Sequence, residues 1–227
     1  MNKQKERFFV KKEVWRLRWR FRLAIIILLS ALVWGLRLPS LRFVSSMLTA
    51  DYAGLPTEAI VIEAWIAVSF AHAERVASIY DNQLIYVILN EKDDLKTNFG
   101  FELDREGVTR KNLIQAGIDE QNIIITITPE REDMPGQTSN HAYHLRQRLM
   151  KDGIQSYTLA TVWYHSQRSC LIYRNAFAET GTEQVQVDCY PLPEVYTPDD
   201  WWHYRTGIID VVMESLKFVY YMLRGFR

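Results

Sequence analysis

Apolar and polar residues follow two different periods along this chain. Short runs rich in β-branched and aromatic residues predict strands at 58–63, 84–89, 122–127, 157–163 and 184–190. Between these runs, apolar residues spaced three or four apart predict helices. Alternating strands and helices are typical of a parallel sheet covered on both faces. The pattern therefore predicts an α/β, three-layer domain with a five-stranded, mainly parallel sheet in the order 3-2-1-4-5, since right-handed crossovers leave few alternatives.

The last predicted helix has a long apolar stripe. We expect the stripe to pack on the sheet, although a membrane surface or a partner protein would satisfy the same spacing. Its members are Ile209, Val212, Leu216, Val219, Tyr220 and Leu223.

The first 57 residues differ from the rest. Residues 23–36 carry no charge, and a transmembrane signal anchor is predicted at 23–44, followed by a linker at 45–57 and the α/β domain at 58–227. A buried helix of a soluble protein and a cleaved signal peptide are the alternatives. The prolines and serines after Arg37 predict an irregular connector.

Charge is distributed unevenly although the formal net charge is zero. Residues 1–22 hold nine basic and two acidic side chains, so the other 205 residues carry −7. An acidic domain argues against nucleic-acid binding. The positive-inside rule predicts a single-pass protein of the inner (cytoplasmic) membrane, with the basic end in the cytoplasm and the C-terminal domain outside it. Its expected membrane partner is the lipid bilayer around the N-terminal helix.

Two cysteines, Cys170 and Cys189, are too few for a disulfide scaffold. In an oxidising compartment they would pair if their geometry allows it, and otherwise they serve as small apolar residues.

Polar residues follow several predicted strands, at the edge where α/β sheets bind ligands. Glu63 and Trp65 follow the first strand, Asp93 follows the second, and His165 and Arg168 follow the fourth. His165 is a candidate acid–base with Glu63 as its partner, and Arg168 a candidate anion ligand. Alternatively, His165 bonds locally and Arg168 pairs with Asp93 or Glu63.

Other candidates have simpler structural interpretations. Thr138 and Asn140 are candidate ligand-binding residues, but each is also a natural helix cap, as is Ser166. His141 and His144 are three apart, yet no carboxylate completes a recognisable metal set, so no metal is expected. The chain contains no glycine-rich phosphate loop, so no dinucleotide cofactor is expected.

Several segments together resemble the YdcF/SanA/ElyC-type family of bacterial envelope proteins, over residues 59–225. The segments are Glu63-Ala64-Trp65, Thr138-Ser139-Asn140, His165 to Ser169, and Trp201-Trp202 before a closing helix that contains Glu214 and Lys217. The resemblance implies a Rossmann-like domain, often membrane-anchored, linked to envelope integrity or peptidoglycan precursor metabolism, with unsettled biochemical activity.

The chain departs from the family pattern after two strands. Relatives commonly have a glycine-rich turn after the second strand, where this chain has the bulky, acidic run from Leu89 to Asp94. Ala64 stands where some relatives have glycine. Both changes narrow the expected pocket, and the acidic run repels an anion.

Three functional hypotheses follow. The first is a membrane-anchored domain for envelope maintenance that binds a phosphate- or sugar-containing precursor through Arg168 and the helix start at Thr138. The second is a hydrolase or transferase that uses His165 as acid–base with Glu63. The third is a non-catalytic interaction module with a degenerate pocket.

Overall fold

The computed structural model describes residues 19–64, 66–91, 103–129, 131, 134, 136–178 and 185–225. The chain divides into two compact units, with the boundary between Leu41 and Arg42. Trp65 and Asp93, two of the predicted site residues, lie outside the described residues.

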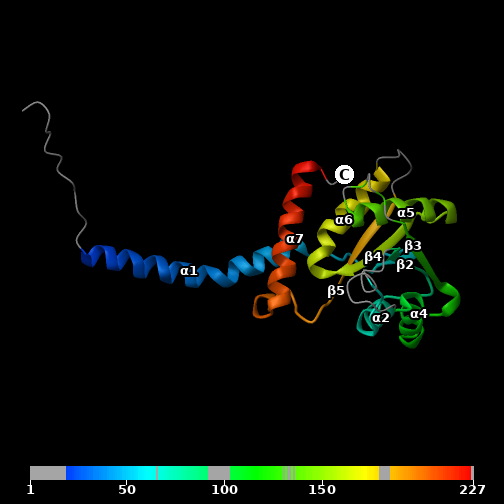
Figure 1. Cartoon of the computed structure of the whole chain (residues 1–227), viewed down its shortest axis with the longest axis horizontal. Helices are drawn as coiled ribbons and strands as arrows, with labels where there is room; N and C mark the ends of the chain where they lie inside the picture. Colours follow the sequence, from blue (N-terminus) through cyan, green and yellow to red (C-terminus); the bar gives the residue numbers. More distant parts are fainter. Residues whose placement is uncertain are drawn as a thin grey trace, which may run out of the picture. The chain divides into compact units, whose positions relative to one another are not determined.

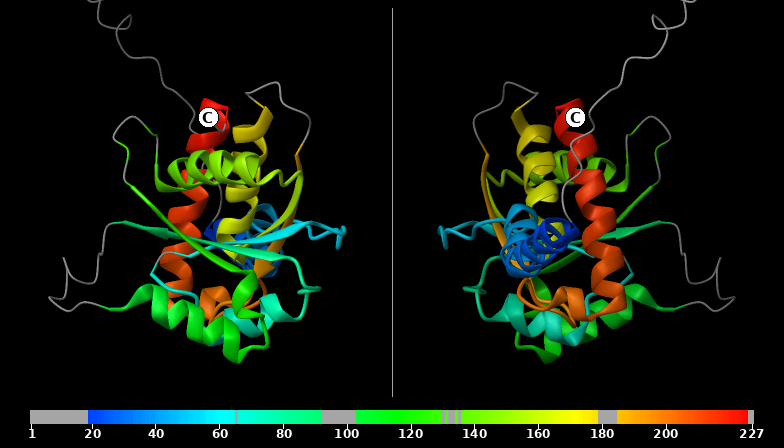
Figure 2. Two further views of the ribbon diagram at one scale, coloured as in Figure 1. Left: turned by 90° about the vertical axis from the view of Figure 1, so that its right-hand side faces the viewer. Right: turned by 90° about the vertical axis from the view of Figure 1, so that its left-hand side faces the viewer.

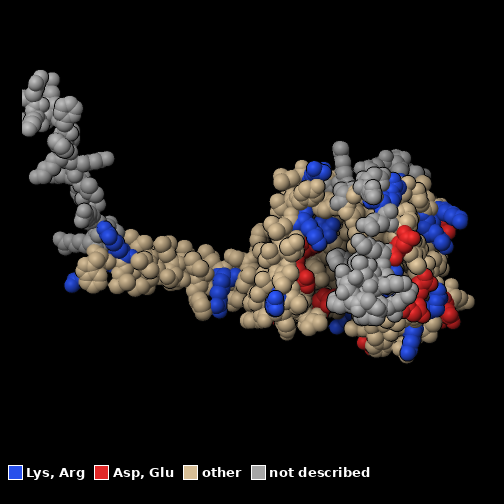
Figure 3. Space-filling view, viewed as in Figure 1, with Lys and Arg blue, Asp and Glu red and all other residues tan. Residues whose placement is uncertain are grey.

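Helix α1 (Trp19–Leu48) contains all described residues of the first unit and continues into the second (Figure 1). Among the described residues it alone is long and apolar enough to cross a membrane, and the side chains of its most apolar 18 residues are not buried. In Figure 3 its surface is uncharged between basic groups near the two ends. This length and composition suit a transmembrane helix.

The helix continues through Pro39 to Leu48, so the irregular connector predicted after Arg37 was wrong over its first part. A proline removes one amide donor, but the other backbone bonds keep the helix intact. In the second unit, Ser45 and Leu48 are buried, and Arg42 Nε lies 3.1 Å from Asp199 Oδ1.

The extended segment after α1 is bound to the α/β domain. The amide of Ala50 donates to Ser166 Oγ at 2.8 Å. The amides of Ala53 and Leu55 donate to the carboxylate of Asp188 at 3.1 and 3.0 Å. The segment is therefore held at three points before the first strand begins.

The described residues form a five-stranded sheet, parallel throughout, in the order β3-β2-β1-β4-β5, which confirms the predicted α/β class and topology. The strands are β1 (Ala59–Glu63), β2 (Leu84–Asn90), β3 (Ile123–Thr128), β4 (Ser156–Val162) and β5 (Gln186–Leu192). Strand β1 is central and buried along its whole length, as expected for a β-branched run covered on both sides.

Helices cover both faces of the sheet (Figure 2). Alternate strand residues pack against α5 (Gln137–Asp152), α6 (Trp163–Ala178) and Tyr221 of α7 (Arg205–Arg224) on one face. The other residues pack against α2 (Phe70–Ala77) and α4 (Arg105–Gln115) on the opposite face. Two short 3₁₀ turns, η1 (Glu120–Asn122) and η2 (Trp201–His203), precede β3 and α7.

Local sequence explains several helix ends. Ser69 caps α2 by accepting from the amide of His72 at 3.2 Å, and Asp104 caps α4 through the amide of Gly107 at 2.9 Å. Gly117 follows α4 and Gly153 caps α5, both with the positive φ that glycine adopts readily at helix ends.

The expected packing of the α7 stripe on the sheet was wrong. Its six predicted residues are 45–85% exposed, and the helix instead packs through Val211, Glu214, Phe218 and Tyr221. A helical period identifies an apolar face but does not determine which face meets the sheet when a second face can also pack.

Candidate functional site

An open cleft of about 840 Å³ lies at the carboxyl ends of β1, β4 and β5. Helix α7 and the segment from β1 to the start of α2 complete its walls. The sheet order reverses direction between β1 and β4, and open α/β sheets bind ligands at such switch points. The cleft is therefore the expected position of a ligand site, and Glu63 and His165 both line it.

His165 and Arg168 lie in the first turns of α6, because this helix begins at Trp163 directly after β4. The expected role of Ser166 as a helix cap was wrong, because the helix begins three residues earlier and Ser166 lies inside it. Without an intervening loop, the spacing of three residues places both side chains on one helix face. Both are buried, at 4% exposure each, and of the two His165 lines the cleft while Arg168 lies behind it.

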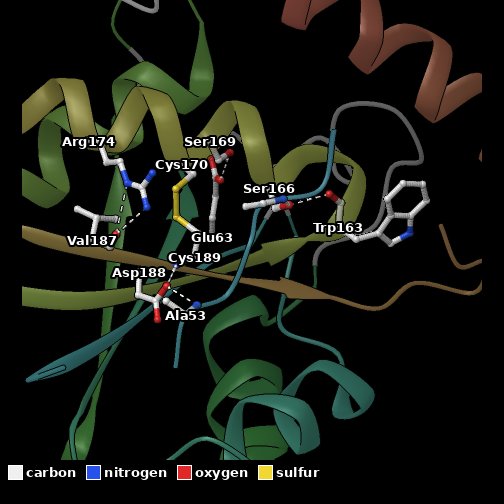
Figure 4. Close-up of a disulfide and its surroundings, with 11 residues drawn as sticks. Ala53, Glu63, Trp163, Ser166, Ser169, Cys170, Arg174, Val187, Asp188 and Cys189 are labelled. Carbon is white, nitrogen blue, oxygen red and sulfur yellow. Dashed lines mark hydrogen bonds between the residues drawn. A yellow bond between two sulfur atoms is a disulfide. The ribbon is translucent and has the colours of Figure 1, made fainter. Parts of the chain in front are cut away.

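Glu63 ends β1 and is buried between three polar groups. Its Oε2 accepts from Ser169 Oγ at 2.8 Å (Figure 4) and lies 3.5 Å from His165 Nε2. Its Oε1 lies 3.5 Å from His141 Nδ1. The structure thus brings the two predicted catalytic residues, Glu63 and His165, into contact.

Glu214 of α7 is the partner of Arg168, so the alternative pairing of Arg168 with Glu63 was wrong. Arg168 donates through Nε to Glu214 Oε1 and through Nη2 to Glu214 Oε2 at 3.3 Å. The guanidinium carbon lies 5.2 Å from the centre of the Tyr221 ring. Arg168 is therefore engaged within the protein, and its geometry suits positioning of Glu214 better than direct capture of a ligand.

His165 lies between two carboxylates. Its Nδ1 is 3.1 Å from Glu214 Oε1, and its Nε2 is 3.5 Å from Glu63 Oε2. Arg168 Nη2 is also 2.8 Å from Nδ1, but a guanidinium donates only to a deprotonated nitrogen. In the protonated imidazole, Nδ1 instead donates to Glu214.

The electrostatics favour that protonated form. Burial opposes charge on all three groups, but their mutual attraction outweighs it. Burial and then the charge of Arg168 lower the pKa of His165, yet Glu63 and Glu214 raise it overall. Burial alone would raise the pKa of Glu63, but His165 and His141 hold it well below its usual value. For Glu214, His165 and Arg168 likewise overcome burial and lower the pKa to about 2.

Thr138 and Asn140 lie in the first turn of α5, and neither caps it. The helix begins after Gly136, which provides no side-chain cap, so the predicted capping role was wrong. Thr138 Oγ1 approaches His165 Nε2 at 3.4 Å and Arg168 Nη1 at 3.5 Å, and so belongs to the buried cluster. Asn140 donates to the carbonyl of Pro129 at 2.7 Å and supports the β3–α5 connection instead.

Sequence reasoning missed the role of one member of the cluster, His141, and reached Ser169 and Glu214 only through the family resemblance. His141 was considered with His144 as a metal pair, but its Nε2 bonds Asn90 Oδ1 and its Nδ1 faces Glu63. Within the described residues, no group of three or more His, Cys, Asp or Glu side chains could hold a metal ion. The sequence did contain a signal for His141. It lies about one turn into the helix that follows the third strand, where a side chain can reach the carboxyl ends of the strands.

The described lining of the cleft is acidic. It includes two permanent cations, Arg75 and Lys217, and two histidines, His72 and His165. It also includes five carboxylates: Glu63, Glu74, Glu194, Asp210 and Glu214. Lys217 Nζ lies 3.7 Å from Glu214 Oε2, so its charge is directed partly toward the buried cluster. Arg168 lies behind the lining and offsets the charge of Glu214. With Arg168 counted and His165 protonated, four positive charges face five carboxylates, and the remaining negative charge disfavours an anionic ligand.

Cys170 and Cys189 form a disulfide between α6 and β5, which settles the two alternatives left open by the sequence (Figure 4). Their Cα atoms are 6.1 Å apart. Because Cys170 directly follows Ser169, the bridge fastens the helix that carries His165 and Arg168 to the neighbouring strand. Arg174 adds a bond from Nη2 to the carbonyl of Val187 at 3.0 Å, one turn further along α6.

A scan of the chain against protein-family models finds no match, and a search among curated proteins finds no relative. The functional argument therefore depends on the geometry of the site and on the resemblance of its segments.

Proposed function

We propose that the domain binds a sugar-containing precursor of the cell envelope in this cleft, while α1 anchors the chain in the cytoplasmic membrane. The acidic lining carries this proposal. Carboxylates accept hydrogen bonds from sugar hydroxyls, and Glu74, Glu194 and Asp210 line the cleft outside the buried cluster. A phosphate would meet repulsion there, so the sugar part of the expected precursor is favoured over its phosphate part.

Three features support a role in the envelope. Helix α1 has the length and composition of a membrane span. The disulfide fits an oxidising compartment. The resemblance to the YdcF/SanA/ElyC-type family also points to envelope maintenance. With the positive-inside orientation, these features favour a domain outside the cytoplasm. A reporter fused after Arg227 should then be active only outside the cytoplasm, and cytoplasmic activity would refute this topology.

A second candidate function is catalysis by His165. One imidazole between two carboxylates, at the floor of a cleft, is an arrangement for general acid–base chemistry. Glu214 orients the ring through Nδ1, and Glu63 exchanges the proton of Nε2. In this proposal the protein is a hydrolase or transferase, and His165 transfers a proton to or from a sugar-linked oxygen.

Ligand-induced thermal stabilisation tests the binding proposal. We expect neutral mono- and disaccharides to raise the melting temperature more than the same sugars carrying a phosphate. Glu194→Gln, at the cleft, should reduce this stabilisation, whereas Glu120→Gln in η1 is exposed, lies outside the cleft and should not. Stronger stabilisation by the phosphorylated sugars, or by inorganic phosphate, would overturn the preference for a sugar.

The variant His165→Ala separates catalysis from binding alone. If His165 is the acid–base, turnover should fall by about 100-fold or more while sugar-induced stabilisation remains. If His165→Ala and Glu63→Gln both restore the phenotype of a deletion strain fully, the domain is a non-catalytic module. One observation favours the non-catalytic module: every carboxylate oxygen of Glu63 and Glu214 already has a partner within the protein.

A further inference from the structure

Helix α7 exposes more apolar surface than a soluble domain normally leaves in water. Nine large apolar side chains between Ile208 and Leu223 are 44–85% exposed, and Leu223 is the most exposed of them. In Figure 3, the surface over α7 is mostly uncharged. Single exposed apolar residues are ordinary, but a contiguous patch of this kind marks an interaction surface.

The patch occupies one side of the helix. At 3.6 residues per turn, its members cover about half of the circumference over a length of about 24 Å. The charged side chains Asp210, Glu214 and Lys217 all lie on the other half. Since the helix packs on the domain through Val211, Phe218 and Tyr221, the patch is not needed for the hydrophobic core.

The ends of the helix suit a lipid surface. Arg205 begins it and Arg224 ends it, and the guanidinium of Arg224 lies 5.1 Å from the ring centre of Tyr220. Arginine and tyrosine at the limits of an apolar face are typical of helices that lie in the interface of an anionic bilayer. A second protein surface would not require this placement of cations.

The point at which the chain enters the domain lies beside the start of α7. Arg42, the first residue of the second unit, is 3.1 Å from Asp199, and η2 and α7 follow directly. If α1 crosses a membrane, its domain end leaves the lipid within a few residues of Arg42. The bilayer surface is then within reach of α7 without an intervening flexible linker.

We propose that the apolar face of α7 lies in the bilayer interface, so that the domain is held to the membrane at two places. This inference rests on α1 as a membrane anchor and does not depend on what the cleft binds. Met213 belongs to the exposed set and also lines the cleft. Docking of α7 therefore brings the cleft to the lipid surface.

The test uses the full chain in vesicles of phosphatidylethanolamine and phosphatidylglycerol that contain acyl-chain spin-labelled lipid. Single variants Leu216→Cys, Val33→Cys and Gln115→Cys are labelled with a thiol-reactive fluorophore, because the two native cysteines are paired. Val33 reports on α1, and exposed Gln115 on α4 is the matched control from the opposite face of the sheet. We expect lipid quenching at residues 216 and 33 to be at least threefold stronger than at 115.

Each other outcome overturns the proposal in a recognisable way. Quenching at residue 33 but not at 216 shows that the anchor is correct and that α7 does not touch lipid. Weak quenching at both positions removes the anchor and the inference together. Absent quenching of the labelled position 216, together with a disulfide between two copies of the unlabelled Leu216→Cys variant, shows that the apolar face is a dimer interface.

Discussion

Two arginine–carboxylate pairs of this domain have the same chemistry in opposite surroundings. Arg168 and Glu214 have side chains that are 5% and 4% exposed, beneath the cleft. Arg148 and Asp152 pair at 2.7 Å on α5, with side chains 40% and 22% exposed. Water competes for the second pair but not for the first, so loss of one partner leaves an uncompensated charge only in the buried cluster. A buried cluster that is costly to break and placed at a cleft is more informative about function than a surface pair.

The largest expected effect is that of Arg168→Met. It leaves Glu214 buried without its main partner and should lower the free energy of unfolding by about 3 to 5 kcal/mol. The matched variant Arg148→Met should cost less than about 1 kcal/mol. Urea unfolding of the two variants measures both changes, and equal losses would show that burial does not distinguish the pairs.

Removing the disulfide sharpens the comparison, because it loosens α6 and leaves every charge in place. The double variant Cys170→Ala, Cys189→Ala opens a loop with a sequence separation of 19 residues. We expect a loss of about 3 kcal/mol, measured by urea unfolding without reductant. The same loss should appear when the native protein is reduced, and an unchanged unfolding curve in both cases would contradict the expected constraint.

The buried cluster should also give stability a pH window. Glu63 and Glu214 have lowered pKa values, so their contribution is complete above the usual 4.5 and is lost as the pH falls, through about 2 for Glu214. His165 has a raised pKa, so its contribution is complete below 6.5 and is lost as the pH rises through its folded value. The cluster therefore stabilises most between pH 4.5 and 6.5.

The difference in unfolding free energy between the native protein and Glu214→Gln, measured from pH 2 to 8, isolates this contribution. It should be greatest inside that window and should shrink on both sides. A difference that does not vary with pH would mean that these groups do not form ion pairs.

The smallest effect concerns a single donor. Ser169→Ala removes the hydroxyl that donates to Glu63 and should cost about 1.5 to 3 kcal/mol, since a bond to a charged, buried acceptor is lost. Ser215→Ala is the control, because Ser215 Oγ donates to the carbonyl of Val211 within its own helix. Thermal unfolding compares the two, and a Ser215 variant that is less stable than the Ser169 variant would contradict the argument.

Sequence periodicity was sufficient for the sheet and insufficient for the site. The β-branched runs placed all five strands within about two residues, and right-handed crossovers left few strand orders, of which the predicted one is found. The direct passage from β4 to α6 was missed, because the residues from Tyr164 to Arg168 are polar and resemble a loop. His165 and Arg168 are nevertheless buried, because they pair with carboxylates that are distant in the sequence. A short stretch of sequence does not contain these partners.

The partners of the cluster illustrate the same limit. Glu63 and His165 were predicted to meet because both follow strands that end at one edge. Glu214 lies 46 residues after Arg168, on α7. Whether it meets Arg168 depends on which face of α7 packs on the domain, and the apolar stripe predicted a different face from the one that packs. Periodicity gives the faces of a helix, whereas the choice between them depends on the shape of the whole domain.

The binding of the extended segment to Ser166 and Asp188 has a mechanical consequence. Ser166 is the residue next to His165, and its hydroxyl accepts from the amide of Ala50, two residues after α1 ends. If α1 crosses a bilayer as proposed, a pull on it would act on this hydrogen bond first, because only two residues separate the helix end from Ala50. Tension would then be felt at the helix turn that holds the imidazole.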